Sequence, residues 1–216
     1  MAVGMTTTTI QPCDIDTYIS SNAATSNYGG SDEIQAGYYN PIIRRGLIKF
    51  DLSSIPSAEV CDSAVLSLWI KRDLATSEMT FSIHRLLLNW VEAQATYNIY
   101  STGNSWPDSG GYGSSCIDMT AMGESGTIVG TSAIDSALID TEIQITITNT
   151  SEMKKMYDGT YTNYGWLLKG TVESDLKMWG FHSSEASTSG YRPKLVVTTS
   201  APISSGVPRF RSYIIS

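Results

Sequence analysis

Few side chains in this sequence could carry out catalysis. The chain has two histidines, His84 and His182, in segments with strand-like alternation. Serine is common, but there is no Gly-x-Ser-x-Gly turn, and the spacing in residues 123–126 is wrong for a nucleophile elbow. No pair of carboxylates stands in the apolar setting that a glycosidase needs. The sequence therefore predicts a protein that is not an enzyme, and a hydrolase that uses His182 is the weaker alternative.

The cysteines indicate neither a zinc site nor a disulfide framework. Cys13, Cys61 and Cys116 are far apart and form no Cys-x-x-Cys pair. Zinc sites built from cysteine and histidine need several ligands at short, regular spacings, so this class of site is excluded. Three is an odd number for disulfides, and we expect reduced thiols; a Cys61–Cys116 bridge stays open for an oxidising compartment.

Two tryptophans are candidates for binding a sugar ring by stacking. Trp69 alternates with the apolar positions of its strand, and Trp106 lies in a glycine-rich loop. Either ring could instead fill a packing layer or hold a loop in place. We interpret Trp90, Trp166 and Trp179 as packing residues.

Lysine and arginine at strand spacing suggest a site for acidic sugars. Arg45 and Lys49 are four residues apart, and Arg192 and Lys194 are two apart, so each pair projects to one face of a strand. Such a strip would bind carboxylates through charge-assisted hydrogen bonds. The alternative is a set of scattered, solvated charges.

Four aspartates could hold a structural calcium ion. Asp14 and Asp16 share a strand face, and Asp51 and Asp62 flank the connection 52–61. Carboxylate oxygens suit this hard cation, but the spacing of a calcium-binding loop is absent. We therefore expect no cofactor, with calcium at these residues as the alternative.

Composition limits the classes of partner. Charged residues make up 16% of the 216-residue chain, against about 25% in a typical globular domain. The formal net charge of −7 argues against nucleic acid, which requires clustered lysine and arginine. The first twelve residues lack a basic stretch followed by an apolar run, and nothing approaches the roughly 20 apolar residues of a membrane helix. We expect synthesis in the cytoplasm and no membrane partner.

Alternation of apolar and polar residues is the dominant structural signal. Ile143, Ile145 and Ile147 alternate with polar residues over 142–148, which is typical of a strand buried on one face. Further strands are predicted over 16–20, 32–37, 47–52, 64–70, 80–87, 126–129, 164–169, 177–182 and 194–199. This pattern predicts an all-β fold, a jelly-roll-like β-sandwich of two antiparallel sheets with one short helix.

The one predicted helix covers residues 150–158. Asn149 and Glu152 have the spacing of a capping box, in which Asn149 accepts from first-turn amides and Glu152 reaches back. Met153, Met156 and Tyr157 form an apolar stripe, and Gly159 supplies a stop. The stretch 98–125 is poor in apolar residues and predicts a large surface loop.

Several motifs in order resemble the disaggregatase-related domain, also called the DNRLRE domain. They are DTYI (16–19), NYG (27–29), RGLIKFDL (45–52), SAVLSL (63–68), WVE (90–92) with Thr96, YGWLL (164–168), FHSSE (181–185) and RPKLV (192–196). The resemblance covers roughly residues 11–200, although Thr96-Tyr97 stands where the family usually has Thr-Trp. It implies a non-catalytic jelly-roll domain related to carbohydrate-binding modules. Some such domains bind alginate and others occur in phage structural proteins.

Two functions follow from these expectations. The preferred one is a virion structural protein on a bacteriophage surface, such as a capsid decoration protein. It would be a homo-oligomer that docks on other virion proteins through one face and through arms at residues 1–12 and 201–216, flanking a domain at 13–200. The alternative is an extracellular carbohydrate-binding module for an acidic polysaccharide. The predicted docking residues of the C-terminal arm are Arg209, Phe210, Arg211, Tyr213, Ile214 and Ile215.

Overall fold

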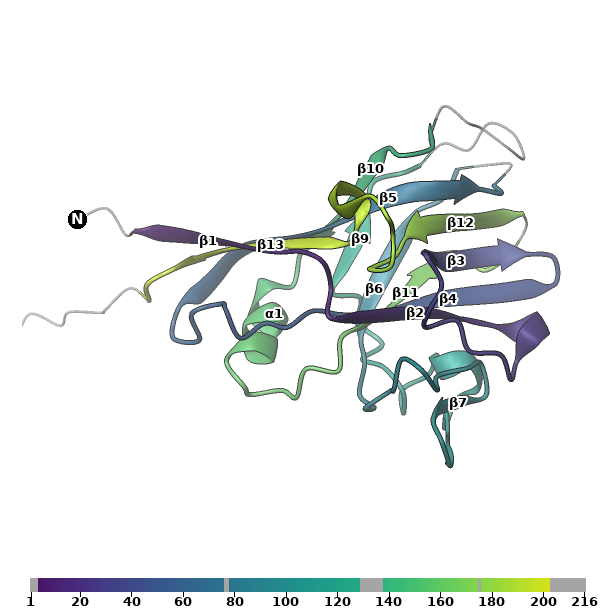
Figure 1. Cartoon of the computed structure of the whole chain (residues 1–216). Helices are drawn as coiled ribbons and strands as arrows, with labels where there is room; N and C mark the ends of the chain where they lie inside the picture. The colour runs from purple at the N-terminus through teal and green to yellow at the C-terminus, as the bar shows by residue number, and fades with distance from the viewer. Residues whose placement is uncertain (1–3, 76–77, 129–137, 175, 203–216) are drawn as a thin grey trace, which may run out of the picture.

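The computed structural model describes residues 4–75, 78–128, 138–174 and 176–202 (Figure 1). Within these ranges the chain is all-β with one α-helix, α1 (Thr150–Tyr157), and short 3-10 turns η1 (Ser21–Ala23), η2 (Ser109–Gly111) and η4 (Ser189–Tyr191). The strands are β1 (Met5–Ile10), β2 (Ile15–Ser20), β3 (Glu33–Tyr39), β4 (Ile42–Lys49), β5 (Val60–Asp73), β6 (Phe81–Arg85), β7 (Ile99–Ser101), β8 (Asn104–Ser105), β9 (Gly123–Ser125), β10 (Glu142–Ile147), β11 (Trp166–Gly170), β12 (Lys177–His182) and β13 (Lys194–Ser200).

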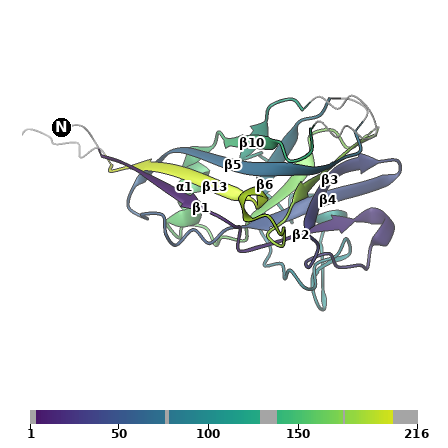
Figure 2. The same ribbon diagram turned by 45° about the horizontal axis from the view of Figure 1, so that its top comes forward.

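One long strand joins the two layers of the sandwich. Along one edge of β5, residues 60–67 pair with β13 and residues 70–73 pair with β12, while β10 pairs along the other edge. The hydrogen-bonded order β1-β13-β5-β10-β9-β6-β11-β4-β3-β12 therefore returns to β5, and β2 branches from β4. The predicted all-β, jelly-roll-like sandwich is confirmed, with its two layers linked into a barrel-like closure (Figures 1 and 2).

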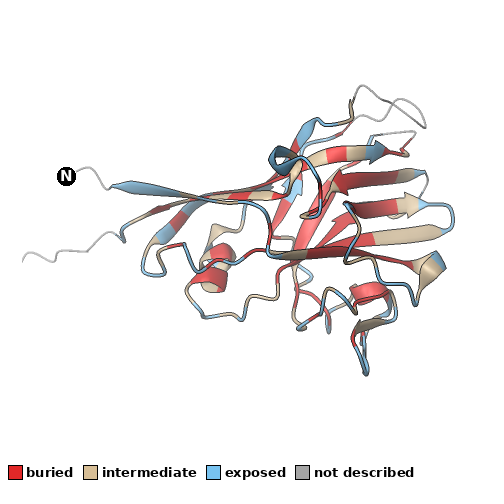
Figure 3. Cartoon of the chain, viewed as in Figure 1, coloured by how far each residue is buried: buried red, intermediate tan, exposed pale blue. Residues whose placement is uncertain are grey.

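The main core lies between the layers and consists of the inward half of each alternating strand. Buried and exposed positions alternate along several strands (Figure 3). In β10, Ile143, Ile145 and Ile147 are buried, while Gln144 and Thr146 are exposed. Burying an isoleucine side chain stabilises the fold by about 1.5–3 kcal/mol relative to leaving it in water.

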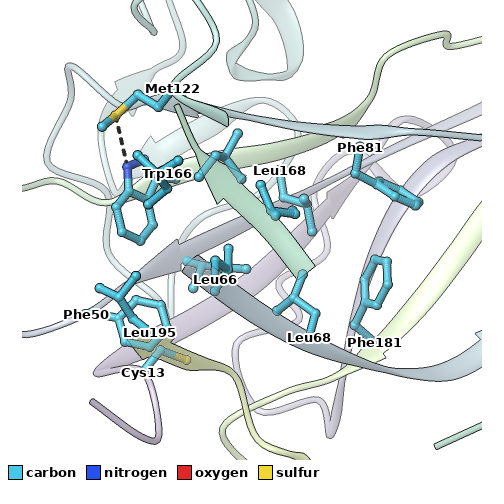
Figure 4. Close-up of a cluster of buried hydrophobic side chains, with 14 of the residues drawn as sticks. Cys13, Phe50, Leu66, Leu68, Phe81, Met122, Trp166, Leu168, Phe181 and Leu195 are labelled. Carbon is cyan, nitrogen blue, oxygen red and sulfur yellow. Dashed lines mark hydrogen bonds between the residues drawn. The ribbon is translucent and has the colours of Figure 1, made fainter. Parts of the chain in front are cut away.

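Aromatic side chains pack among leucines in this core (Figure 4). The rings of Phe81 and Phe181 meet edge to face, with their centroids 5.1 Å apart. The Trp166 indole N–H donates to the sulfur of Met122 at 3.2 Å. The interpretation of Trp166 and Trp179 as packing residues is confirmed, since both are fully buried.

A second apolar cluster lies outside the sandwich, between the β4–β11 layer and the segment 86–117. It contains Leu47, Trp90, Trp106, Cys116 and Leu167, all buried. The segment predicted as a surface loop over 98–125 is therefore packed onto the sheet by its few apolar side chains, and it includes β7, β8 and η2.

Three strand predictions differ from the structure. β4 ends at Lys49, so Phe50 and Leu52 are buried without belonging to a strand. A strand was predicted over 126–129, but β9 covers Gly123–Ser125 instead. Ile128 forms only an isolated bridge with Met79. Residues 5–10, expected to be part of an arm, form β1 against β13. Their threonine-rich sequence lacks apolar alternation, so the pairing arises from tertiary contact.

The predicted helix is confirmed, with a difference in its cap. The Asn149 side chain accepts from the backbone N–H of Glu152 at 3.4 Å, as expected. The Glu152 carboxylate does not reach back; it accepts from Lys155 at 2.6 Å, and the Asn149 N–H donates to the carbonyl of Met122. Met153, Met156 and Tyr157 are buried against the core.

Candidate functional site

The predicted cationic residues do not form one strip, because β4 and β13 lie in different layers. The Arg45 guanidinium donates to both carboxylate oxygens of Glu173, at 2.8 and 2.7 Å, and to the carbonyl of Gly110 at 2.8 Å. Its side chain is only 6% exposed. The expectation that Arg45 faces a ligand is therefore wrong: the η2 loop covers it, and its charge is neutralised by Glu173.

Two more of the predicted cationic residues, Lys49 and Arg192, also contact groups of the chain itself. The Lys49 ammonium lies 3.7 Å from the carboxylate of Asp14, at the surface of the β4 layer. The Arg192 guanidinium donates to the carbonyl of Ala186 at 2.9 Å, which holds the turn before β13. Neither is placed beside an exposed aromatic ring by a contact in the described part of the chain.

Trp106 is not an exposed stacking platform. Its side chain belongs to the second cluster and the residue is 5% exposed. The indole N–H donates to the carbonyl of Thr96 at 2.8 Å, and the ring packs against Tyr100 with the centroids 5.5 Å apart. The glycine-rich loop folds back and buries the ring, so Trp106 holds the loop in place.

Trp69 and Lys194 meet on the open face of β5. Trp69 is half-buried, and the Lys194 ammonium lies 4.8 Å from the centroid of its ring. The Glu142 carboxylate of β10 lies 3.5 Å from the same ammonium. Glu142 is the register partner of Trp69, and Lys194 is the partner of Ser67, so adjacent strands assemble this group of side chains.

Within the Trp69–Lys194–Glu142 group, the Glu142 carboxyl is ionised at neutral pH. A hydrogen bond from Ser67, with further contributions from Gln144 and Lys194, lowers the pKa of Glu142 below its ordinary value. The lysine ammonium therefore lies between a carboxylate and a π-face. A cation over an indole gains about 0.5–1 kcal/mol at an exposed site. The face around this group carries both polar and apolar side chains; it includes Val65, Gln144, Thr146, Val196 and Thr198, all half-buried or exposed.

A second aromatic ring, that of Tyr191, belongs to a group of side chains that is connected to β5 next to Trp69. The ring of Tyr191, in η4, lies 5.1 Å from the imidazole of His182, whose Nε2 is 2.8 Å from the carboxylate of Asp140. The Asp140 N–H donates to the carbonyl of Ile70, the residue after Trp69. Asp140 has φ of 63°, a conformation uncommon outside glycine and often found at functional sites.

Sequence reasoning missed Glu142, Asp140 and Tyr191. Each is separated from Trp69 by about 70 residues or more of chain. No local pattern distinguishes them from ordinary polar or turn residues, because only the strand register brings them to Trp69. The positive φ of Asp140 would not have been visible either, since no glycine or asparagine marks it.

The four predicted calcium ligands do not gather. No group of three or more histidine, cysteine, aspartate or glutamate side chains in the described residues is arranged to hold a metal ion. Asp16 accepts from Cys13 Sγ and the Ser184 N–H, Asp51 accepts from Ser53, and Asp62 accepts from Ser200. Asp14 faces Lys49. These contacts lie at separate turns and strand ends, so the predicted set is not one site.

A serine–histidine pair is present but closed. His84 Nδ1 lies 3.1 Å from the carbonyl of Asp118, so that nitrogen carries the proton, and Nε2 accepts from Ser82 Oγ at 3.2 Å. Burial lowers the pKa of His84, which keeps the ring neutral. Both residues are buried, and the Tyr112 ring covers the imidazole edge to face. The pair therefore serves to satisfy buried polar atoms.

The thiols are unpaired: Cys13, Cys61 and Cys116 are free and buried. Cys61 lies in the main core and Cys116 in the second cluster, so the bridge left open by the sequence is not formed. None of the described helices is long and apolar enough to cross a membrane. The predicted arm residues 209–215 lie outside the described residues.

Hollows elsewhere on the surface lack aromatic platforms. One, of about 370 Å³, is lined by Val60, Cys61, Thr150, Ser151, Lys154, Lys155 and Asp158. Another, of about 190 Å³, is lined by Glu78, Met79, Thr80, Thr127, Thr171, Val172 and Lys177. Neither lining includes a ring on which a sugar could stack.

Comparison with protein families finds a match to part of the chain. Residues 6–105 match carbohydrate-binding module family 96. The matched segment, a little less than half of the chain, runs from β1 to β8 and includes Trp69, but it excludes Glu142 and Lys194. No curated protein is significantly similar to the chain. The match supports carbohydrate binding over the predicted virion role, and it is consistent with the jelly-roll-like fold.

Proposed function

We propose that this protein is a non-catalytic carbohydrate-binding module that takes an acidic polysaccharide on the open face of β13, β5 and β10. The observation that carries the proposal is the Lys194 ammonium over the half-buried ring of Trp69, with Glu142 as its partner. The match of residues 6–105 to a carbohydrate-binding family supports the ligand class.

The charges favour a uronate-type sugar over a neutral one. A sugar carboxylate can take the place of Glu142 at Lys194 and form a charge-assisted hydrogen bond, while the sugar ring stacks on Trp69. Any sugar that stacks on this face of Trp69 displaces the ammonium from the ring, but a neutral sugar offers the ammonium no carboxylate in return. Glu142 therefore weakens binding, because its carboxylate competes with the carboxylate of the ligand for the Lys194 ammonium.

The surface suits an extended chain. Polar side chains on β13, β5 and β10 continue along the strands from Trp69, and Tyr191 with His182 and Asp140 continues around the end of β5. Such a strip provides stacking and hydrogen bonds over several sugar units. Enclosed pockets, by contrast, bury a small ligand on most of its surface.

The test is affinity electrophoresis through gels that contain alginate, polygalacturonate or a neutral β-glucan, followed by titration calorimetry. We expect retardation by an acidic polymer and weaker retardation in high salt. Lys194→Ala and Trp69→Ala should each weaken binding about tenfold or more, since a charge-assisted hydrogen bond contributes about 1.5–3 kcal/mol. Glu142→Gln should strengthen it.

Lys49→Ala is the matched control, because it removes one positive charge from the other layer. It should bind like the wild type. Absence of retardation by every acidic polymer would remove the proposed function. Loss of binding in Lys49→Ala with normal binding in Lys194→Ala would place the site on the wrong layer and refute the assignment.

The virion role, the likeness to the DNRLRE domain, the predicted domain limits and the localisation stay predictions. The C-terminal residues on which virion docking depended lie outside the described part of the chain. No contact among the described residues favours that role over carbohydrate binding.

A further inference from the structure

Among the described residues, the main sheet has an edge strand with one free side. Within residues 4–75, 78–128, 138–174 and 176–202, β1 pairs with β13 alone, from Met5 opposite Ser200 to Ile10 opposite Leu195. Most of its residues are exposed, and Met5 is 67% exposed. In an antiparallel edge strand every second residue turns its N–H and C=O to the free side. β1 extends with β13 away from the body of the sandwich, so that side is accessible (Figure 1).

The strand carries none of the usual protection of an edge. Its sequence, MTTTTI, has no charged residue and no proline, and its pairing with β13 has no bulge. The edge strand β2 is different: most of its residues are buried, and Glu92 accepts from the N–H of Asp16 at 2.9 Å. Natural proteins cover or charge their edges to prevent pairing, so an uncovered, uncharged edge indicates a place where pairing is used.

We propose that β1 pairs with β1 of a second copy of this chain, antiparallel, about a two-fold axis normal to the sheet. Residues 6–9 are all threonine, so two-fold registers centred on Thr7 or on Thr8 both oppose threonine to threonine. Cross-strand threonine pairs stabilise antiparallel sheets, and Thr7 Oγ1 already lies 3.3 Å from Thr198 Oγ1 within the chain.

The uncharged run of threonine in β1 favours a second copy as the occupant. The chain has a net charge of −7, so two copies repel over most of their surfaces. β1 is an uncharged stretch that meets its own copy without like charges in opposition. The axis keeps the outer faces of both sheets on the same side, which is the isologous arrangement expected of a dimer.

The arrangement has a consequence for binding that rests on the proposed function. Both Trp69 faces would lie on one side of a continuous sheet. A long polysaccharide could then engage both, and the second contact would be intramolecular, which raises overall avidity. The dimer itself does not depend on any glycan.

The experiment is sedimentation velocity of the full chain without glycan, over a wide range of protein concentration. We expect a dimer, and Thr7→Lys should weaken dimerisation about fivefold or more, because like charges then face each other across the axis. Mixing Thr7→Lys with Thr7→Glu should restore a heterodimer. Thr146→Lys is the matched control on β10, an exposed position on the same face but not at the edge, and it should dimerise like the wild type.

A cysteine scan gives a second readout that does not rely on charge. Under mild oxidation Thr7→Cys or Thr8→Cys should form a disulfide-linked dimer, whereas Thr146→Cys should not. A monomeric wild type at every concentration, or equal cross-linking of the edge and control variants, would overturn the proposal. Neither result would bear on glycan binding, and a dimer that fails to bind any glycan would leave the edge pairing standing.

Discussion

The buried carboxylate of Asp16 makes the stability of this protein depend on pH in an unusual direction. Asp16 is 1% exposed, and burial raises its pKa from 3.8 to about 6, although hydrogen bonds from Cys13 and the Ser184 N–H favour the charged form. The carboxylate of Glu185 lies near enough to add repulsion. The neutral form of Asp16 is therefore more favoured in the folded protein than in the unfolded chain.

The sign follows from the two protonation equilibria. Below pH 3.8 Asp16 is protonated in both the folded and the unfolded state, and its stabilisation is fully present. Between 3.8 and about 6 the unfolded chain loses the proton first, so the free energy of unfolding falls as the pH rises. Each pKa unit corresponds to about 1.4 kcal/mol, so the total loss through this window is about 3 kcal/mol.

The perturbation is Asp16→Asn, which removes the charge and keeps an oxygen that can accept from the Ser184 N–H. Urea unfolding at several pH values between 4 and 8, followed by the fluorescence of the buried tryptophans, gives the free energy of unfolding. The difference between variant and wild type should shift in favour of the variant by about 2.4 kcal/mol from pH 4 to pH 7, because part of the loss has already occurred at pH 4.

Asp14→Asn is the control, because it removes a carboxylate charge from an exposed position two residues away. Its difference from the wild type should not follow the same curve. A difference for Asp16→Asn that is flat across the window, or one that matches the Asp14→Asn curve, would refute the reasoning that burial disfavours the Asp16 charge.

Three further substitutions test the packing described above. Trp106→Ala should lower the free energy of unfolding by about 3–5 kcal/mol, because it leaves a cavity in the second cluster. The measurement is urea unfolding followed by circular dichroism, and a cost under 1 kcal/mol would show that the loop is not packed onto the sheet. Glu173→Gln should cost about 3 kcal/mol by the same measurement, since it leaves the Arg45 charge buried without its partner, and a neutral result would contradict that burial. Asn149→Ala should cost about 1 kcal/mol through loss of the cap on α1, whereas Ser151→Ala should cost less.

Local patterns were sufficient for most strands and for the helix. Burial on one face imposes a period of two on a strand, and this period is visible in the isoleucines of β10 without knowledge of their partners. The same holds for α1, whose cap and apolar stripe lie within ten residues. β1 escaped prediction because its run of threonine has no period; it is a strand only because β13 offers it a free edge.

The residues of the candidate site could also be predicted only in part from the sequence. The sequence nominated Trp69 and Lys194 as ligand-binding residues from their types, but it nominated Arg45 and Trp106 on equal grounds. What separates them is burial: the loop from 97 to 118 helps to bury Arg45 and Trp106, while Trp69 stays half-buried. Whether a side chain is buried depends on where a distant segment of the chain packs, and this cannot be inferred from the type of residue.

The sequence by itself determined the class of fold, because hydrophobic alternation is a local property that commits each segment to a half-buried strand. The tertiary structure alone decided that Glu142 stands opposite Trp69 and that Lys194 lies over its ring. Each of those neighbours lies more than 70 residues from Trp69 along the chain, and register between strands is set by the packing of the whole core.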